Sequence, residues 1–436
     1  MNPQDRRSFL RTTGAAALST AASPILGANN RVNAAVIGLG GRGGNHIDIL
    51  AALPECRVAA VCDVNQAAQE RAVARVEKAA GYKPRAYYDM RELFANKEID
   101  AVSIATPNHW HALSTIWACQ AGKDVYVEKP ACHNIFEGRK MIEAARKYKR
   151  MVMVGSQSRS LAFKIRAIEL LREGIIGEVY MAKGLCFKRR RSIGHTPDEP
   201  VPPGLNWDLF LGPAQMKPYS KNKFAYNWHW FWDTGNGDIG NQGVHEMDIA
   251  HWGLGVQGLP AAVVSTGGKF VYQDDQETPN TQLATFEYGN KQIVFEVRGL
   301  LTGEEGGIQW RGGNVIGNLF FGSEGWMAVD AWGFQVYKGE KNEKIMDEKP
   351  KERTWDTVPH MANFLAAVRT RDPKTLTASV EIGVNAANLC HLANISYRLK
   401  RKLAFDPVQW IFPGDAEANA LATRAYRPPY VVPDVV

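Results

Sequence analysis

The sequence predicts two domains, a doubly wound parallel α/β sheet followed by an α+β domain with a large, mostly antiparallel sheet. A chain of 436 residues is long enough for two cores, because single cores rarely grow beyond about 250–300 residues. Short β-branched runs alternate with helical periods over residues 31–155, which is typical of a parallel sheet covered on both faces. Over residues 156–436, strand-like alternation dominates and few helical periods interrupt it.

Hydrophobic periodicity places the elements of the first domain. Runs of β-branched and small apolar residues indicate strands, and the segments between them have helical spacing. We expect strands at 32–37, 58–62, 101–105, 124–127 and 151–154, and helices from about 43, from about 66, over 109–121 and over 136–148.

The second domain follows a crossover at 155–159. Its strand-like segments suggest a mostly antiparallel sheet with one face over a helix layer, and two late helices have the apolar spacing to pack back against the body. We expect strands at 179–187, 262–267, 282–288, 292–297 and 326–330, and helices at 361–370 and 379–400.

The first thirty residues have the features of an export signal. Arg6 and Arg7 are followed by Phe9-Leu10 and then by a mildly apolar, Ala- and Thr-rich stretch that ends in small residues. Paired arginines followed by Phe-Leu resemble the twin-arginine type of signal. We therefore expect residues 1–30 to be recognised by the twin-arginine export machinery and the mature protein to be periplasmic or otherwise exported.

Composition excludes several functional classes. The net charge of +7 is modest for this length and does not predict nucleic-acid binding. No apolar run beyond the leader is long enough to cross a bilayer, so we expect a mature protein without membrane integration. The six cysteines are scattered inside apolar segments, which predicts small buried side chains, and no Cys/His spacing predicts a metal site.

A nucleotide signature follows the first predicted strand. Residues 38–43 read Gly-Leu-Gly-Gly-Arg-Gly and fit G-x-G-x-x-G, where glycine lets the backbone approach a pyrophosphate at a helix N-terminus. Asp63 ends the second strand 20 residues after Gly43, where a carboxylate can bind both ribose hydroxyls. Because that carboxylate would repel a 2′-phosphate, the cofactor expected is NAD, with NADP disfavoured.

Two further motifs lie at carboxyl ends of predicted parallel strands, where open α/β sheets bind ligands. They are Thr106-Pro107-Asn108-His109-Trp110-His111 and Glu128-Lys129-Pro130. With the glycine-rich turn, they make residues 32–403 resemble the family of glucose-fructose oxidoreductase, inositol dehydrogenase and the rhizopine catabolism protein, Gfo/Idh/MocA, whose first domain is a Rossmann fold. The residues expected to contact the cofactor are Gly38, Gly40, Arg42, Gly43, Asp63, Thr106, Asn108, His111, Glu128 and Lys129.

The resemblance also implies a catalytic centre. In the family, the lysine of Glu-Lys-Pro contacts both the nicotinamide ribose and the reacting hydroxyl, which assigns that role to Lys129. A Gly-rich stretch then leads to a helix with an Asp and, four residues later, a His, and His245 matches the histidine. The residue four before it is Asn241, whose amide can bind a hydroxyl but cannot take a proton. Asp238 or Asp248 could supply the missing negative charge, and Asp238 could instead cap the helix.

Three nearby segments permit more than one interpretation. Residues 228–232 are rich in aromatic side chains, which suit the C–H faces of sugars but also suit core packing. Trp207 and Asp208 resemble another family motif, with no indication of whether they touch a ligand. The basic run at 188–191 is typical of a solvated loop, or of a site for an acidic sugar or a phosphate.

These observations predict an NAD-dependent oxidoreductase acting on a hydroxyl of a sugar, with His245 removing the proton and Lys129 stabilising the alkoxide. Because free NAD is scarce outside the cytoplasm, an exported enzyme should keep and recycle its cofactor. A second sugar could accept the hydride, or the enzyme could be a redox-neutral glycoside hydrolase that returns it. The remaining alternative is a non-catalytic sugar-binding protein, and family resemblance implies a homo-oligomer.

Overall fold

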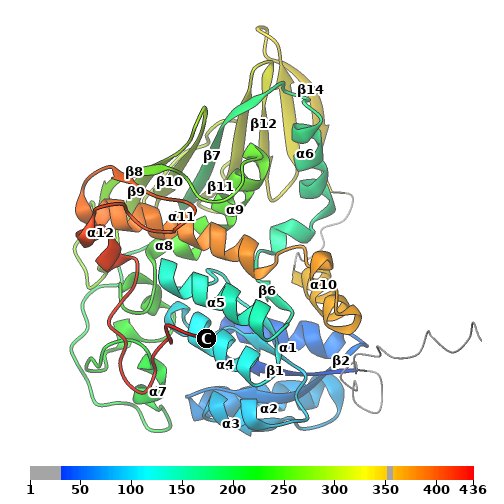
Figure 1. The fold of residues 1–436 in the computed structure, drawn as a ribbon, viewed down its shortest axis with the longest axis vertical. Coiled ribbons are helices and arrows are strands. Elements are labelled where there is room, and N and C mark those ends of the chain that lie inside the picture. The colour runs from blue at the N-terminus through cyan, green and yellow to red at the C-terminus, as the bar shows by residue number, and fades with distance from the viewer. Residues whose placement is uncertain (1–30, 351–356) are drawn as a thin grey trace, which may run out of the picture.

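The computed structural model describes residues 31–350 and 357–436, so the predicted export signal lies outside the described part. Figure 1 shows a parallel sheet in the lower half of the molecule and a larger, mostly antiparallel sheet in the upper half. The predicted fold class is therefore confirmed.

The six-stranded sheet has the order β3-β2-β1-β4-β5-β6, and all its neighbouring strands are parallel. Parallel strands need crossovers, which the intervening helices provide. Its strands are β1 (Val32–Ile37), β2 (Cys56–Cys62), β3 (Arg85–Tyr87), β4 (Ala101–Ile104), β5 (Asp124–Val127) and β6 (Val152–Val154), and its helices are α1 (Gly41–Ala52), α2 (Gln66–Ala80), α3 (Met90–Ala95), α4 (Asn108–Gln120) and α5 (Ile135–Lys147).

The nine-stranded sheet has the order β14-β13-β12-β11-β7-β10-β9-β8-β15. Only the pairing of β7 with β10 is parallel among the pairs of this sheet in the described chain. Its strands are β7 (Val179–Lys188), β8 (Ala262–Gly268), β9 (Thr281–Tyr288), β10 (Lys291–Arg298), β11 (Asn314–Gly322), β12 (Gly325–Asp330), β13 (Phe334–Lys338), β14 (Glu343–Glu348) and β15 (Leu403–Ala404).

Helices of the second half surround the larger sheet and reach the smaller one. They are α6 (Ala162–Arg172), α7 (Trp207–Leu211), α8 (Gly237–Asn241), α9 (Gly243–Leu254), α10 (Thr357–Thr370), α11 (Val380–Leu399) and α12 (Ala416–Leu421). Short 3-10 helices occur at Gln157–Ser160, Lys221–Lys223, Asn227–Trp230 and Pro373–Thr375.

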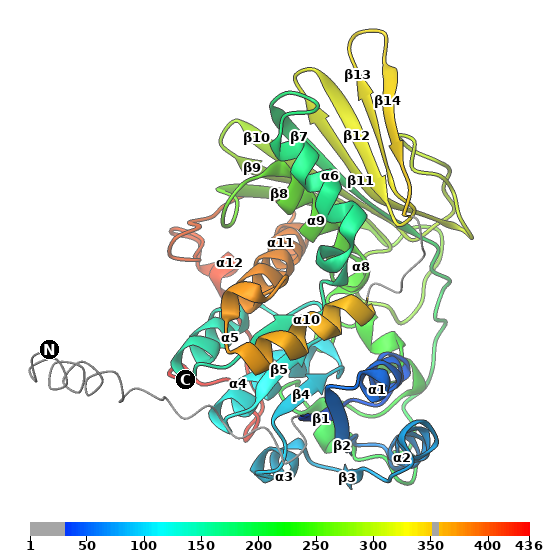
Figure 2. The same ribbon diagram turned by 90° about the vertical axis from the view of Figure 1, so that its right-hand side faces the viewer.

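Helix α11 joins the two cores. Val384 on one of its faces packs with the core of the parallel sheet, whereas Leu389 and Leu392 pack with Phe286 under the antiparallel sheet. Figures 1 and 2 show α11 crossing the molecule between the two sheets, and α10 lies beside the parallel sheet, where Phe364 is part of its core. Burial on both faces holds the two sheets in one arrangement, which fixes the site between them.

Three expectations from composition can be compared with the described residues. All six cysteines are buried and unpaired, which confirms that they are small core side chains. Within 31–350 and 357–436, no cluster of three or more His, Cys, Asp or Glu side chains is arranged to bind a metal. Over the same ranges, no helix combines the length and the apolar character needed to span a bilayer.

Candidate active site

The glycine-rich turn after β1 has the shape that a dinucleotide requires. Gly38 has φ of +84°, and a Cβ atom on it would lie 2.7 Å from the backbone of Ala105. A Cβ atom on Gly43 would lie 1.8 Å from the carbonyl oxygen of Gly38. A Cβ atom on Gly40 would instead meet no described atom within 4 Å, which leaves open space at the start of α1. The turn and the helix N-terminus together fit a pyrophosphate.

Asp63 and Thr106 lie beside this turn. The carboxylate of Asp63 accepts hydrogen bonds from the backbone N–H groups of Leu39 at 2.6 Å and Asn65 at 2.9 Å, so it is held at the end of β2. Burial raises the pKa of Asp63. The Thr106 hydroxyl is buried and has no hydrogen-bond partner among the described residues. A buried hydroxyl beside open space fits a bound cofactor, because buried polar groups are otherwise nearly always paired.

Arg42 and Glu128 pair with each other. Arg42 Nε donates to Glu128 Oε1 at 2.7 Å, and the same oxygen lies 3.0 Å from His46 Nε2 and 3.0 Å from Gln157 Nε2. Burial alone would raise the pKa of Glu128, but the charge of Arg42, the hydrogen bond with His46 and the charge of Lys129 outweigh it and hold this pKa well below its usual range. These contacts join α1 to the end of β5, so Glu128 positions the segment that carries Lys129.

Asn108 and His111 connect the strand-end loops. The Asn108 amide is buried and donates to Asn236 Oδ1 at 3.0 Å, which joins α4 to the loop before α8. The two ring nitrogens of His111 lie 2.7 Å from the carbonyl oxygen of Pro130 and 2.8 Å from that of Thr106. Burial lowers the pKa of His111. The structure therefore gives these two side chains protein partners at the edge of the predicted cofactor site.

Lys129 and Asn241 meet although 112 residues separate them in the chain. Lys129 Nζ donates to the carbonyl oxygen of Asn241 at 2.8 Å and lies 3.5 Å from its side-chain Oδ1. Burial lowers the pKa of Lys129 to about 8, with Glu128 opposing this shift and Arg42 adding to it. An ammonium group with this pKa can donate a hydrogen bond and also exchange a proton near neutral pH.

The Tyr226 hydroxyl is next to this pair, and sequence reasoning did not single it out. Its oxygen accepts from the Asn241 side-chain amide at 2.9 Å and from Arg190 Nη1 at 3.1 Å. The residue is 51% exposed, so its ring borders open space. Two donors occupy the lone pairs of the phenolic oxygen, which leaves the phenol's own proton for a third partner. Asn241 thus accepts from Lys129 through its backbone carbonyl oxygen and donates to Tyr226 through its side-chain amide, and an ionised aspartate could not make this donation.

His245 lies on α9 one helical turn after Asn241. Burial lowers the pKa of His245 well below its usual value, and the charge of Lys129 adds to this effect, so the imidazole is neutral. Within the described part of the chain, its ring makes no hydrogen bond. Asp238 is instead paired with Arg190, and the carboxylate of Asp248 is held by a bidentate contact at 2.8–3.0 Å from a second arginine, Arg159. Both nearby carboxylates therefore have arginine partners, and neither holds the imidazole.

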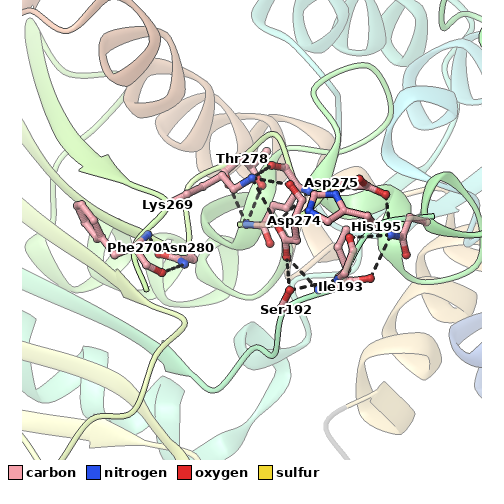
Figure 3. Close-up of polar contacts among 12 residues, drawn as sticks. Ser192, Ile193, His195, Lys269, Phe270, Asp274, Asp275, Thr278 and Asn280 are labelled. Carbon is pink, nitrogen blue, oxygen red and sulfur yellow. Dashed lines mark hydrogen bonds and ion pairs between the residues drawn. The ribbon is translucent and has the colours of Figure 1, made fainter. Parts of the chain in front are cut away.

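The loop that carries Arg190 is anchored by a separate polar cluster, which Figure 3 displays. Asp274 accepts from Ser192 Oγ at 3.1 Å and from the backbone N–H of Ile193 at 2.9 Å, and His195 Nδ1 lies 2.7 Å from Asp275. These contacts hold the basic run against the segment before β9. Arg190 consequently points inward to Asp238, which rules out a fully solvated loop at this residue.

We expect the substitution Arg190→Ala to destabilise the protein by about 3–5 kcal/mol, because it leaves the carboxylate of Asp238 buried without a charge partner. The two groups are in contact at 2.6 Å, and their side chains are 16% and 3% exposed. Chemical denaturation followed by tryptophan fluorescence measures this loss. The exposed neighbour Arg191 has no contact of this kind, so Arg191→Ala should stay within about 0.5 kcal/mol of the parent. Equal stability of the two variants would contradict the assignment.

The other segments with two interpretations are now resolved in part. Trp230 is buried below Arg190, whose guanidinium lies 5.1 Å from the ring, and Trp228 stacks on His229 with centroids 3.5 Å apart. Trp207 is buried and stacks on a neighbouring ring, whereas Asp208 is paired with a C-terminal arginine. The tryptophans at 207, 228 and 230 therefore pack against protein, and Tyr226 is the ring among 226–230 with the largest exposure.

Models of known protein families match both domains of the chain. The model described as "Oxidoreductase family, NAD-binding Rossmann fold" matches residues 32–156. The model described as "Oxidoreductase family, C-terminal alpha/beta domain" matches residues 176–295 and 329–432. The chain belongs to the Gfo/Idh/MocA oxidoreductase family. Its first domain is that family's NAD-binding domain.

Curated relatives of this Gfo/Idh/MocA protein include glycoside hydrolases. A glycosyl hydrolase family 109 protein from Saccharopolyspora erythraea is 28% identical over 265 residues, which cover 55% of this chain and 52% of the relative. An alpha-N-acetylgalactosaminidase from Shewanella oneidensis is 30% identical over 152 residues, which cover 34% of this chain and 33% of the relative. The chain thus spans about half the length, or less, of the curated relatives it matches.

Solved structures share the fold at low sequence identity. The WlbA dehydrogenase from Chromobacterium violaceum, in complex with NADH and UDP-GlcNAcA, is 19% identical with a TM-score of 0.63, covering 87% of this chain and 97% of that one. The aldose-aldose oxidoreductase from Caulobacter crescentus is 19% identical with a TM-score of 0.62, covering 86% of this chain and 100% of that one. The likeness extends over both domains of the fold.

Proposed function

We propose that this protein is an NAD-dependent glycoside hydrolase that cleaves a glycosidic bond without net oxidation. The observation that carries this proposal is that an ammonium and a phenol meet at one residue: Lys129 Nζ donates to the backbone carbonyl oxygen of Asn241, and the Asn241 side-chain amide donates to the Tyr226 hydroxyl. Oxidation of a hydroxyl needs one proton-exchanging group, Lys129, besides His245. Cleavage of the glycosidic bond needs a second one, which Tyr226 supplies. Similarity to glycosyl hydrolase family 109 proteins supports this reaction over a single oxidation.

The cofactor proposed is NAD. The residues that would hold it are the turn at Gly38 to Gly43, Asp63 and Thr106, whose partnerless hydroxyl and adjoining open space fit the group. The Asp63 carboxylate disfavours a 2′-phosphate and so favours NAD over NADP. When bound, NAD supplies a hydride acceptor at C4 of its nicotinamide ring.

Lys129 and His245 carry out the opening oxidation in this scheme. His245, which is neutral, takes the proton of a ring hydroxyl, and the C–H hydrogen of the same carbon leaves as hydride with its electron pair. The Lys129 ammonium donates a hydrogen bond to the oxygen as negative charge develops on it, and a carbonyl group results. Its contact with the Asn241 carbonyl oxygen at 2.8 Å fixes where that ammonium lies.

Tyr226 performs the second proton transfer in this scheme. The new carbonyl group acidifies the neighbouring C–H, whose proton leaves to the Tyr226 oxygen after the phenol has passed its own proton to solvent. The electron pair forms a C=C bond as the bond from the anomeric carbon to the leaving oxygen breaks, and that oxygen takes a proton from solvent water. Water then adds at the anomeric carbon and releases one proton to solvent, while the neighbouring carbon regains a proton from Tyr226. The hydride returns to the carbonyl carbon, and its oxygen takes back the proton that His245 holds. Overall, one water cleaves one glycosidic bond.

The test uses the purified protein with its bound nucleotide and a panel of para-nitrophenyl glycosides, without any added electron acceptor. We expect nitrophenol release with many turnovers per protein and no net change in nicotinamide absorbance. In deuterium oxide, the released sugar should carry one deuterium on the carbon next to the oxidised one. Release of nitrophenol without deuterium incorporation would contradict the elimination scheme.

A second candidate function is net transfer of hydride between two sugars. It is favoured by the fold similarity to an aldose-aldose oxidoreductase and by the fact that Lys129 and His245 serve an oxidation in either case. In that case an oxidised sugar and a reduced sugar would accumulate in equal amounts, and glycosides would remain uncleaved. Chromatography of the products of the same incubations distinguishes the two reactions.

We expect Asn241→Asp to slow glycoside cleavage by about 10–100-fold. An aspartate would accept the phenolic proton of Tyr226 in place of donating to its oxygen, and would stabilise the Lys129 ammonium at 3.5 Å. The alkaline limb of kcat/KM, which the Lys129 pKa of about 8 sets, should therefore move to higher pH. Tyr226→Phe should lower the rate of glycoside cleavage as much as Asn241→Asp does, but it should leave the alkaline limb of kcat/KM at the parental pH. An unaltered pH profile for Asn241→Asp would refute this role of the amide.

We further propose that the protein is exported by the twin-arginine pathway and retains its cofactor through each cycle. A redox-neutral reaction needs no second enzyme to reoxidise the nucleotide, which suits a compartment without free NAD. Chromatography of nucleotide released by acid from the undialysed mature protein tests this. A near-stoichiometric nicotinamide nucleotide supports a closed cycle, and an empty protein with weak affinity for added NAD contradicts it.

A further inference from the structure

A cavity of about 250 Å³ lies apart from the residues proposed for hydride transfer. Its lining comes from α11, from the segment around α12, from loop 232–236 before α8, and from the start of α5. Figure 1 shows α11, α12 and α8 close together at one edge of the molecule. Among its lining residues are neither Lys129 nor Tyr226 nor His245. The cavity is therefore a separate candidate site.

Two arginines supply the charge of this cavity. The Arg424 Nη1 donates to the carbonyl oxygen of Asp233 at 2.8 Å and contacts His133 Nδ1 at 3.3 Å, but its buried Nε has no acceptor among the described residues. The Arg398 guanidinium lies 5.2 Å from the ring centre of Trp232, and within the described chain it forms no ion pair. Both guanidinium groups thus keep unused N–H donors at one cavity.

The other titratable groups around the cavity leave this positive charge in place. Burial and the charge of Arg424 hold the pKa of His133 well below its usual value, and burial lowers the pKa of His391 to about 4, so both rings are neutral. Asp233, the one carboxylate among the described lining residues, is in contact with Lys217 at 2.6 Å and also lies 3.9 Å from Arg424 Nη2, so two arginines face one shared carboxylate. The lining carries a net positive charge, which favours an anion.

We propose that this cavity binds an organic anion of monosaccharide size, such as an acidic sugar. Guanidinium groups present paired N–H donors that match the two oxygens of a carboxylate. Trp232, Ile395 and Leu421 line the same cavity and offer apolar surface to the C–H groups of the ligand. The volume approaches the roughly 300 Å³ at which small-molecule sites begin and exceeds the need of a bare inorganic ion.

Isothermal titration of the NAD-loaded protein tests the proposal with three probes, namely glucuronate, glucose and inorganic phosphate. We expect glucuronate to bind and glucose, which has the same ring without the carboxylate, to bind at least tenfold more weakly. Binding of phosphate without binding of glucuronate would overturn the proposal, as would equal binding of glucose and glucuronate.

Matched variants locate the binding site. Arg398→Ala should weaken glucuronate binding at least tenfold, whereas Arg369→Ala, at an exposed arginine in the last turn of α10, should leave it unchanged. Lys129→Met should also leave glucuronate binding unchanged while removing turnover, so failure of this site and failure of the proposed function can be told apart. If Lys129→Met loses glucuronate binding and Arg398→Ala retains it, the anion binds in the active site and the proposal is refuted.

Discussion

Replacing Lys129 with methionine should lower turnover by about 10³-fold while the nicotinamide nucleotide stays bound. The substitution removes the ammonium group that donates to the Asn241 carbonyl oxygen. The charge that stabilises the developing alkoxide is lost with it. Loss of one such donor in other enzymes costs about 10²–10³, and loss of a proton-exchanging group costs a similar factor. The bound nucleotide is measured by chromatography after acid release, and turnover by nitrophenol release.

A matched variant separates charge from proton exchange. Lys129→Arg keeps a positive charge at every accessible pH, because a guanidinium does not lose its proton in proteins. The Lys129 pKa of about 8 means that the parent loses its ammonium, and therefore its rate, as the pH rises through about 8. We expect Lys129→Arg to have a low turnover rate, and we expect this rate not to fall as the pH rises through about 8. Retention of more than a tenth of the parent turnover in Lys129→Met would contradict the assigned role.

Gly38→Ala should abolish nucleotide binding and also lower the thermal midpoint of the protein. Its φ of +84° costs an L-residue about 1–2 kcal/mol, and the added Cβ would lie 2.7 Å from the backbone of Ala105 and Thr106. Relief of that contact requires movement of the end of β4, which would carry the Thr106 hydroxyl away from the turn. Nucleotide content and thermal unfolding followed by circular dichroism measure the two effects.

Gly40→Ala is the matched comparison, because its φ of −66° suits alanine and its Cβ would meet no described atom within 4 Å. We expect this variant to keep the parental thermal midpoint and to lose nucleotide, since a methyl group would then fill space that the pyrophosphate would need. Full nucleotide content in Gly40→Ala would show that the cofactor does not occupy this space. Parental stability in Gly38→Ala would contradict the steric argument.

Several strands and helices escaped prediction for identifiable reasons. Strand β11 contains Gly317 and Asn318, which interrupt its apolar alternation, yet it lies in the middle of the larger sheet between β12 and β7. Asn318 is tolerated there because its amide donates to the carbonyl oxygen of Glu246 at 2.7 Å. Helix α6 was missed at 162–172, where its apolar residues pack under the sheet. Such pairings depend on distant residues that no local pattern contains.

The site residues also divide into those that the sequence predicted and those whose role only the fold shows. The glycine-rich turn and Asp63 were predicted from local sequence, because each follows a strand at a spacing that the backbone itself enforces, whereas the role of Lys129 was predicted from the family resemblance. The role of Tyr226 was not predicted, although the aromatic run that follows it was noticed, and Arg190 was noticed only as part of the basic run at 188–191. Their roles arise from contacts with Asn241 and Asp238, which come from a different part of the chain.

The sequence by itself determined the order of the two domains, the nucleotide turn and the segments that carry the proposed catalytic groups, because these follow from periodicity and from short-range spacing. Only the tertiary structure decided which partner each polar side chain has. It pairs Glu128 with Arg42, Asp238 with Arg190, and Asn241 with both Lys129 and Tyr226. The physical reason is that a buried charge or amide must find its partner wherever packing brings one, and α11 and the loops between the sheets bring together residues that are far apart in the chain.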